Sequence, residues 1–457
     1  MIQLENIIFL IVAALGIGLF VWQIRKIRKN VLMGRDVDLS DNPSERINKT
    51  LLVAFGQQKM FKRMLPAVLH LFVYVGFLVI NIEVIEILID GVFGTHRVLA
   101  FLGPLYSALM FINEILAALV IVACVIFLWR RNVTKLPRLA TGVEMRAWPK
   151  LDANFILITE IVLMLALFTF NIAGLKLVQL DGGEVAGSYP ISQMFVNFFG
   201  DNPNSLHIIE RAGWWFHIIG ILAFMNYLPS SKHFHIIMAF PNVYYSKLWP
   251  KGKFTTNPAI THEIKAMLDP SYQPPAPEMD AEGNPIVQRF GAKDVEDLTW
   301  KQLMDAYTCT ECGRCTSVCP ANITGKLLSP RKIVMDTRDR MEEKGESPAI
   351  FAPNHYKELG VERVQTTDEK TLLRGYITPE ELWACTTCNA CVESCPVNID
   401  QLSTIMDLRR YLVLEESAAP ASVNAMFTNI ENNGAPWAFS PSDRFNWSED
   451  LYVPSKN

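Results

Sequence analysis

The sequence predicts an all-α protein in two parts, a bundle of five membrane-spanning helices followed by a mostly helical soluble domain. Five apolar stretches lie before residue 240, and each can supply the roughly 20 apolar residues that a spanning helix needs. Eight of the nine cysteines follow residue 300, in a more polar part of the chain. Apolar residues in that part recur at helical spacing, as in 402–416.

The five apolar stretches are the first element of the prediction. The first stretch lacks the basic leading region and the small-residue cleavage site of a signal peptide, so we expect a retained helix. The stretches cover 6–24, 64–89, 98–129, 154–175 and 208–228.

The charges of the connecting loops predict the orientation. Segment 25–63 carries ten Lys or Arg residues and 130–153 carries six, whereas 90–104 and 176–206 carry one each. Under the positive-inside rule the two basic loops face the cytoplasm. We therefore expect a multi-pass protein of the bacterial cytoplasmic (inner) membrane, with an outside N-terminus and with everything after residue 228 in the cytoplasm.

The cysteines form two copies of one pattern, C-x2-C-x2-C-x3-C-P, which begin at Cys309 and Cys385. This is the bacterial two-cluster ferredoxin signature, in which the fourth cysteine of each run ligates the other cluster. The pattern predicts two [4Fe–4S] clusters. We expect one on Cys309, Cys312, Cys315 and Cys395, and the second on Cys385, Cys388, Cys391 and Cys319.

Other roles for these cysteines fit the pattern less well. Disulfides are disfavoured on the reducing cytoplasmic side. Paired zinc sites would need only C-x2-C twice and would leave the C-x3-C-P portion without a role. Cys124 lies in an apolar run and is expected to be a small buried hydrophobic residue.

The sequence shows no acid–base or nucleophilic constellation, so catalytic residues are unknown. A net charge of −4 gives no indication of nucleic-acid binding.

Four carboxylates lie in or beside the apolar stretches: Glu83, Glu86, Glu114 and Glu160. They are either proton relays or groups hydrogen-bonded within the bundle.

Histidines are the candidate haem ligands, because ionisable groups at membrane depth are expensive and usually functional. His70 and His217 lie in apolar stretches, and His235 follows the fifth stretch. In one continuous helix, His217 and His235 would share a face, because they are 18 residues or five turns apart. His70 is the counterpart on the second stretch. It pairs with His235, which we favour, if the fifth helix continues past Pro229, and otherwise with His217.

The stretch 217–235, which has a histidine at each end and Pro229 between them, resembles the fifth helix of the respiratory nitrate reductase gamma subunit and its relatives. These are five-helix cytochrome b proteins in which both histidines ligate haems. Their second helix carries two histidines ten residues apart; His70 matches the first, whereas Ile80, which cannot bind iron, stands at the second. The resemblance implies one haem b on His70 and His235 near the cytoplasmic face, and leaves a second haem at His217 open.

The soluble half resembles the iron–sulfur subunits of heterodisulfide reductases and of fused haem and iron–sulfur proteins that link electron-transfer flavoprotein to menaquinone. The resemblance lies in Cys-Gly-Arg-Cys at 312–315, Gly-Lys-Leu-Leu-Ser-Pro at 325–330 and the second cysteine run. Segment 429–447 is similar to the linker that precedes a cysteine-rich CCG domain in fused relatives. No cysteine follows Cys395, so we expect a cytoplasmic partner, of the CCG type or the electron-transfer-flavoprotein type, to supply the substrate site.

These observations predict a five-helix transmembrane cytochrome b-type bundle followed by a ferredoxin-like cytoplasmic domain. The expected parts are a haem b domain at 1–240, a connector at 241–298, a cluster domain at 299–416 and a partner-binding tail at 417–457. The expected function is electron transfer in a respiratory oxidoreductase, between the partner, the clusters, haem b and membrane menaquinone or ubiquinone. Two alternatives stay open: a quinol-oxidising subunit that feeds a cytoplasmic disulfide or sulfur-compound reductase, and a membrane-anchored redox sensor.

Overall fold

The computed structural model describes residues 4–145, 148–250, 252–276, 279, 283, 289–346, 348 and 370–451. Over these residues the regular secondary structure is helical, and isolated β-bridges pair Arg35 with Thr299 and Leu373 with Ile377. The predicted all-α class is confirmed for this part of the chain.

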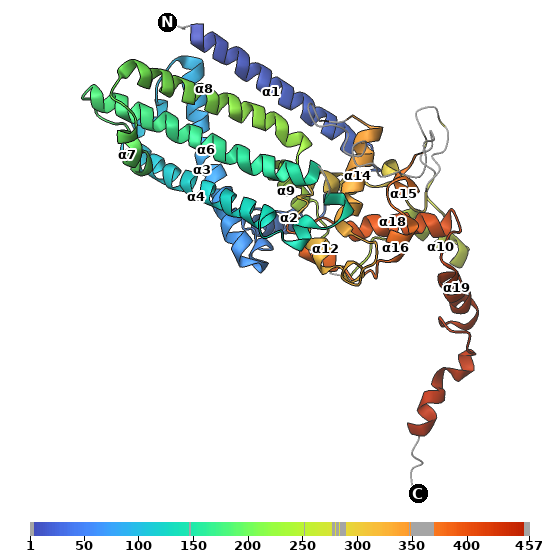
Figure 1. Ribbon diagram of the computed structural model, residues 1–457. Helices are drawn as coiled ribbons and strands as arrows, with labels where there is room; N and C mark the ends of the chain where they lie inside the picture. Colours follow the sequence, from blue (N-terminus) through green and yellow to red (C-terminus); the bar gives the residue numbers. More distant parts are fainter. Residues whose placement is uncertain are drawn as a thin grey trace. The chain divides into compact units, whose positions relative to one another are not determined.

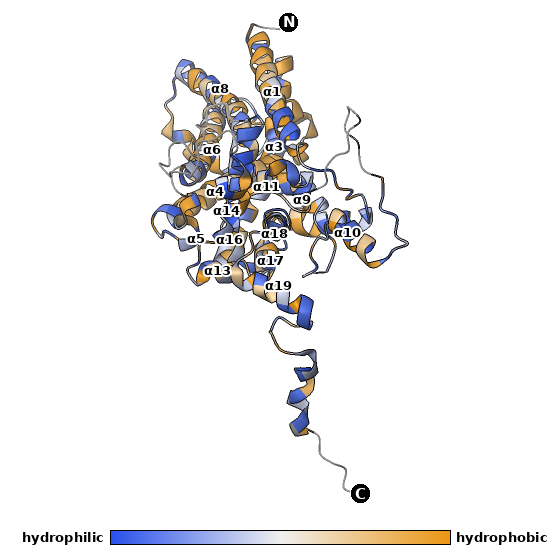
Figure 2. Cartoon of the chain, turned by 90° about the vertical axis from the view of Figure 1, so that its right-hand side faces the viewer, coloured by the Kyte–Doolittle hydropathy of each residue, from blue (hydrophilic) through white to orange (hydrophobic). Residues whose placement is uncertain are grey.

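Among the described residues, five helices are long and apolar enough to cross a membrane. Figure 1 shows them side by side, and Figure 2 shows that their residues are mostly hydrophobic. Each corresponds to one of the predicted apolar stretches. They are α1 (Leu4–Val31), α3 (Met64–Phe93), α4 (Pro104–Asn132), α6 (Trp148–Leu180) and α8 (Pro203–Tyr227).

The five helices pack as one bundle. α6 contacts both α8 and α4, α3 contacts α4, and α1 contacts α8 and α3. Close approach of α1 to α3 depends on Gly91, because a Cβ there would lie 2.5 Å from the ring of Phe9. Tyr106 and Ile218 are fully buried in the core, whereas Phe216 and other apolar side chains face outward, as expected of helices that contact lipid.

Two helix ends differ from the prediction. The third helix begins at Pro104 rather than at residue 98, because Val98–Leu102 forms a 3₁₀ turn and Gly103 follows with φ +57°. The fifth helix ends at Tyr227, and Ser231 is extended with φ −117° and ψ 161°. The cause is Pro229, which lacks a backbone N–H and clashes with the preceding turn of a helix. The continuous fifth helix that would place His217 and His235 on one face is therefore absent. The expectation that His70 could meet His235 only if this helix continued was wrong, because His235 lies beside His70 without it.

Short elements lie between the long helices and after the last of them. After α1 come α2 (Pro43–Thr50), a π turn (Leu51–Phe55) and a 3₁₀ turn (Met60–Lys62). After α4 come α5 (Pro137–Ala140) and the turn Val143–Met145, and after α6 come α7 (Pro190–Phe195) and the turn Val196–Phe198. Beyond α8 lie the turns Leu228–Ser230 and Lys232–Phe234, and then α9 (His235–Tyr244).

The cysteine-rich region is built from short helices. They are α11 (Trp300–Thr308), α12 (Arg314–Val318), α13 (Pro320–Ile323), α14 (Pro330–Lys344), α15 (Leu372–Gly375), α16 (Pro379–Trp383) and α17 (Ala390–Ser394), preceded by the turn Val295–Asp297. This region and the membrane helices belong to one compact unit, formed by residues 1–254 and 294–405.

A second unit comprises residues 255–293 and 406–457. The predicted connector is not wholly irregular, because it contains α10 (Pro258–Leu268), whose first turn is capped by the side chain of Asn257. The helix predicted at 402–416 is α18 (Gln401–Leu414), most of which belongs to this unit. The tail forms α19 (Ala421–Asn433) and the 3₁₀ segment Pro441–Leu451. The predicted domain boundaries stay a prediction.

Candidate redox centres

The first cysteine motif begins where α11 ends, at Cys309. A capping box between Thr299 and Gln302 fixes the start of α11. Gly313, which follows Cys312, has φ +68°, and a Cβ there would lie 2.5 Å from the carbonyl oxygen of Arg138. Only glycine fits both this left-handed conformation and this close approach.

The second motif repeats the local structure of the first. A capping box between Thr378 and Glu381 starts α16, which precedes Cys385. Thr387 and Asn389 both have positive φ, as Glu311 and Gly313 do at the equivalent positions of the first motif. The backbone N–H of Thr387 donates to Cys385 Sγ at 3.4 Å, and the N–H of Glu311 donates to Cys309 Sγ at 3.4 Å. Such N–H donors stabilise a sulfur that carries negative charge.

Packing of α12 against α17 brings the two motifs together. Burial raises the pKa of Cys315, and the thiolates of Cys312, Cys309 and then Cys395 from the second motif act in the same direction. Burial likewise raises the pKa of Cys391, with contributions from Cys385 and Cys319. Each neighbourhood thus contains members of one motif and the fourth cysteine of the other.

This is the grouping that the sequence predicts, and the ligand roles of these cysteines stay a prediction. Cys391 also contributes to the pKa of Cys315, so the two neighbourhoods adjoin. No three His, Cys, Asp or Glu side chains of the described residues lie close enough to bind a single metal ion. A [4Fe–4S] cluster differs from such a site, because its four thiolates bind four different iron atoms.

The two groups of cysteines differ in exposure. Cys309, Cys315 and Cys395 are buried, whereas Cys388 is exposed and Cys385 is partly exposed. The group that contains Cys388 is therefore the more accessible from solvent. Cys124 is fully buried in α4 at 0% exposure, in keeping with the hydrophobic role predicted for it.

His70 and His235 lie beside each other, with ring centroids 6.3 Å apart. Nδ1 of His70 lies 3.1 Å from Oε1 of Gln57, and Nδ1 of His235 lies 2.9 Å from the carbonyl oxygen of Lys232. Metal-bound histidines commonly use their second ring nitrogen in this way. An ion bound by two imidazole nitrogens at about 2 Å each would separate the ring centres by about 6 Å. The pair therefore fits a bis-imidazole haem site.

His217 is only 1% exposed, and its Nδ1 lies 3.0 Å from the carbonyl oxygen of Leu163. Its Nε2 is buried and has no hydrogen-bond partner among the described residues. Ile80, where related cytochromes have a second histidine on this helix, is buried and apolar. A haem at His217 therefore stays an open prediction.

His233 is a third histidine at the His70 and His235 site. Its ring stacks on that of His235 with centroids 5.8 Å apart, and it meets Phe224 edge-on at 5.4 Å. Burial lowers the pKa of His233 to about 3, and the neighbouring histidines act in the same direction, so the ring is neutral near pH 7.

His96 and His207 are exposed and His262 lies in α10, whereas His355 lies outside the described residues.

A buried ion pair links this histidine site to the first cysteine motif. Nζ of Lys232 lies 2.5 Å from Oε2 of Glu311, the residue before Cys312, and Arg338 contacts Oε1 of Glu311 at 2.9 Å. Burial alone would raise the pKa of Glu311, but Lys232 and Arg338 lower it to about 2. Asp152 of α6 accepts from the backbone N–H of Lys232 at 3.2 Å. Lys232 thus contacts the membrane bundle through Asp152, the first cysteine loop through Glu311, and His235 through its own carbonyl oxygen.

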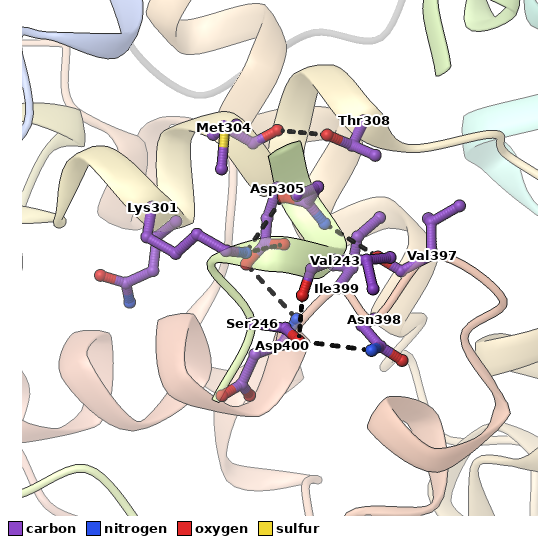
Figure 3. A network of polar contacts seen from close by, with 12 residues as sticks. Val243, Ser246, Lys301, Met304, Asp305, Thr308, Val397, Asn398, Ile399 and Asp400 are labelled. Atoms are coloured by element: carbon purple, nitrogen blue, oxygen red, sulfur yellow. Dashed lines mark hydrogen bonds and ion pairs between the residues drawn. The ribbon is translucent and has the colours of Figure 1, made fainter. Parts of the chain in front are cut away.

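A second polar network anchors α9, the helix that begins at His235 (Figure 3). Lys301 of α11 donates to Asp305 at 2.7 Å and to Asn242 of α9 at 3.0 Å. Asn242 in turn donates to the carbonyl oxygen of Val397, just after the second cysteine motif, at 2.9 Å. The helix of His235 is therefore joined to the segments that flank both motifs.

Sequence reasoning missed Gln57 and Lys232. Gln57 lies in an irregular segment 13 residues before His70, and no periodic pattern connects the two residues. Lys232 looks in the sequence like an ordinary basic residue at a membrane boundary. Only the tertiary fold brings either side chain to the histidine site.

The carboxylates in the bundle have hydrogen-bond donors. Glu86 accepts from the N–H of Leu99 at 2.8 Å and from the hydroxyl of Tyr106 at 3.1 Å. Glu114 accepts from two backbone N–H groups at the start of α7, and Glu83 accepts from Asn113 at 2.6 Å. Of the two roles considered from sequence, hydrogen bonding within the bundle therefore accounts for three of the four. Glu83 and Glu86 also line a cavity of about 190 Å³ where α1 begins and α3 ends.

Comparison with known protein families identifies the cysteine-rich region. Two family models, each described as "4Fe-4S dicluster domain", match residues 308–399 and 276–324. The chain therefore carries a 4Fe–4S dicluster domain. No solved structure matches the chain.

Similar curated proteins extend the comparison over almost the whole chain. The probable iron-sulfur-binding oxidoreductase FadF of Bacillus subtilis is 31% identical over 97% of this chain and 61% of its own length. The EtfAB:quinone oxidoreductase of Syntrophomonas wolfei is 25% identical over 94% of this chain and 57% of its own length. The relatives are iron–sulfur oxidoreductases.

A further relative covers only part of the chain. One component of the dihydromethanophenazine:CoB–CoM heterodisulfide reductase of Methanosarcina mazei is 26% identical over 34% of this chain and 35% of its own length. The resemblance to heterodisulfide reductase-related iron–sulfur proteins, inferred from the motifs, is thereby confirmed. The chain spans only about 60% of the length of FadF and of the quinone oxidoreductase.

Proposed function

We propose that this protein is an electron-transfer subunit of a membrane quinone-linked oxidoreductase. In this proposal electrons pass between a cytoplasmic partner, two [4Fe–4S] clusters, haem b and membrane menaquinone or ubiquinone. The observation that carries the proposal is the pairing of His70 with His235, 6.3 Å apart, in the same compact unit as both cysteine motifs.

The clusters and the haem would each supply reversible one-electron chemistry. The chain's own task is to hold them in a fixed order. The exposed Cys388 favours the cluster of Cys385, Cys388, Cys391 and Cys319 as the one that faces the cytoplasmic partner. The buried cluster of Cys309, Cys312, Cys315 and Cys395 would come next, because Glu311 in its loop contacts Lys232 beside His235.

The residues around the histidines can orient a haem. Gln57 and the carbonyl of Lys232 fix the two rings through Nδ1 and leave each Nε2 for the iron. Neutral imidazole is the form that binds metal. Burial lowers the pKa of His235, which keeps its ring neutral near pH 7.

The membrane setting of the proposal follows from the apolar helices and the loop charges. The five apolar helices suit a membrane domain, and the basic loops suit a cytoplasmic position for the cluster region. A bacterial inner membrane, a quinone as the membrane substrate and a partner of the electron-transfer-flavoprotein or CCG type are parts of the proposal. The quinone and the electron-transfer-flavoprotein partner are supported by the activity for which the quinone oxidoreductase of Syntrophomonas wolfei is named.

Spectroscopy of the purified full-length chain tests this function. We expect about eight iron atoms in two cubane clusters by iron analysis and electron paramagnetic resonance, and a b-type haem in the dithionite-reduced absorption spectrum. Addition of a quinol analogue to anaerobic protein should reduce the haem. A protein that binds both clusters but no haem would contradict electron conduction to the membrane and would favour the redox sensor.

A further inference from the structure

Three arginines converge beside the first cysteine motif, from segments far apart in the chain. Arg63 immediately precedes α3, Arg138 lies in α5, and Arg314 lies between Cys312 and Cys315. Arg63 and Arg138 both donate to residues that flank Arg314, to Ser317 Oγ and to the carbonyl oxygen of Cys312. Arg314 is only 5% exposed.

The contacts of these arginines are all with neutral groups. Arg314 donates to the carbonyl oxygen of Lys59 at 3.1 Å, Arg63 donates to Ser317 Oγ at 3.2 Å, and Arg138 donates to the carbonyl oxygen of Cys312. Within the described part of the chain, no carboxylate forms an ion pair with any of the three.

Other arginines of the same unit that are largely shielded from solvent have carboxylate partners. Arg331 pairs with Glu144 at 2.9 Å, Arg338 pairs with Glu311 at 2.9 Å, and Arg340 pairs with Asp294 at 2.7 Å. Arg63, Arg138 and Arg314 therefore differ from their neighbours in having positive charge without a matching carboxylate.

Three neighbouring arginines without a carboxylate partner lower the stability of the folded protein when no ligand is bound. Arg314 is buried, and Arg63 and Arg138 are partly shielded from solvent beside it. A buried charge without a partner destabilises a fold. The site is therefore suited to an anionic ligand.

The cysteine side of the site accounts for part of the missing negative charge. Arg314 lies between Cys312 and Cys315, and Arg138 donates to the carbonyl oxygen of Cys312, so a cluster would lie on that side. The other side faces the histidine site, because Arg314 donates to the carbonyl oxygen of Lys59, two residues after Gln57, whose side chain contacts His70. Arg63 immediately precedes α3, the helix that carries His70.

We propose that Arg63, Arg138 and Arg314 bind the propionate carboxylates of a haem b held by His70 and His235. This inference rests on the haem of the proposed function. A haem carries its two propionates on one edge, and the planar guanidinium group binds carboxylate through paired N–H donors. The propionate edge then points toward the first cysteine motif, and the arginines lie between the two redox centres.

The test compares two porphyrins that differ only in the propionates. Full-length protein is produced in haem-deficient cells, placed in nanodiscs of zwitterionic lipid and titrated with haemin or with haemin dimethyl ester, while the Soret absorbance is followed. Wild-type protein should bind haemin at least tenfold more tightly than the ester, because a charge-assisted hydrogen bond contributes about 2 kcal/mol. Arg314→Gln and Arg63→Gln should each remove most of this preference.

The control is Arg28→Gln, an exposed arginine in α1, which should keep the wild-type preference. Arg63→Gln lies outside the cysteine motifs, so it tests the inference even if Arg314→Gln loses iron. Equal binding of both porphyrins to wild-type protein would overturn the inference, as would an unchanged preference in Arg63→Gln. If the arginines instead bind lipid phosphate, the porphyrin preference is absent and anionic lipid stabilises the wild-type protein. Failure of both porphyrins to bind wild-type protein would contradict the haem of the proposed function itself.

Discussion

Lys232 contacts both proposed redox centres: its Nζ lies 2.5 Å from the carboxylate of Glu311, and its carbonyl oxygen lies 2.9 Å from Nδ1 of His235. Removal of either charge should change the reduction potentials, because both side chains are buried and therefore weakly screened. Lys232→Met removes positive charge and should lower the haem potential by tens of millivolts. Glu311→Gln removes negative charge and should raise it.

Optical redox titration of the haem measures these shifts, with Lys265→Met in α10 as the control for the loss of a lysine. The haem content of Lys232→Met should stay near the wild-type value, because the carbonyl that holds His235 is unchanged. Shifts of the same sign in Lys232→Met and Glu311→Gln would contradict an electrostatic role.

The proposed haem ligands can be tested by haem content. His70→Ala or His235→Ala should remove one haem, because each deletes an axial ligand. His207→Ala, an exposed histidine near the start of α8, is the control and should retain haem. The pyridine haemochrome assay on purified protein gives the result. Full haem in His70→Ala would exclude this residue as a ligand.

The two cysteine groups can be separated by single substitutions. Cys388→Ala should cost one cluster, because this residue is a predicted ligand of the second group. It should leave the haem of the membrane half in place, because Cys388 is the exposed member of that group. Cys124→Ala should leave iron content unchanged. Iron and sulfide analysis, with electron paramagnetic resonance of the reduced protein, distinguishes these outcomes. Retention of both clusters in Cys388→Ala would contradict the predicted ligand set.

Gly313 and Gly325 form a matched pair for a backbone test. Both have positive φ, but a Cβ at Gly325 meets open space, whereas a Cβ at Gly313 lies 2.5 Å from Arg138 and 2.6 Å from Arg331. Gly325→Ala should cost only the strain of the left-handed conformation, about 1 kcal/mol. Gly313→Ala should destabilise the protein considerably more and reduce cluster content. Thermal melting followed by the visible absorbance of the clusters compares the two variants. Equal melting temperatures would contradict the contact.

The ion pair of Asp294 and Arg340 predicts an acid-sensitive contribution to stability. Burial would raise the pKa of Asp294, but hydrogen bonding to Arg340 outweighs it and lowers the pKa below the usual value. The pair therefore stabilises the fold above the unfolded pKa of about 4, and this contribution is lost as pH falls through the lower folded pKa. Asp294→Asn should cost about 3 kcal/mol at pH 7. The difference from wild type in thermal melts should shrink below pH 4, roughly, and exposed Asp443→Asn is the control.

Residue spacing and hydropathy were sufficient to predict the features that a short stretch of sequence determines by itself. The five helices follow from long apolar stretches, and the grouping of Cys395 with Cys315 follows from the fixed geometry of the cysteine run. The start of the third helix could not be predicted, because residues 98–102 are as apolar as the helix that follows. The contacts of Gln57, Lys232 and Arg63 depend on segments that meet only in the tertiary fold, and no periodicity signals them.

The break after Tyr227 has a consequence for assembly. His235 does not belong to a membrane helix; it opens α9, which Asn242 and Lys301 fasten to the iron–sulfur region. A haem bound by His70 and His235 would therefore take one axial ligand from the membrane bundle and the other from α9, which is joined to the iron–sulfur region. The membrane bundle synthesised alone would lack one of the two ligands, so haem binding would require the cysteine-rich half to have folded.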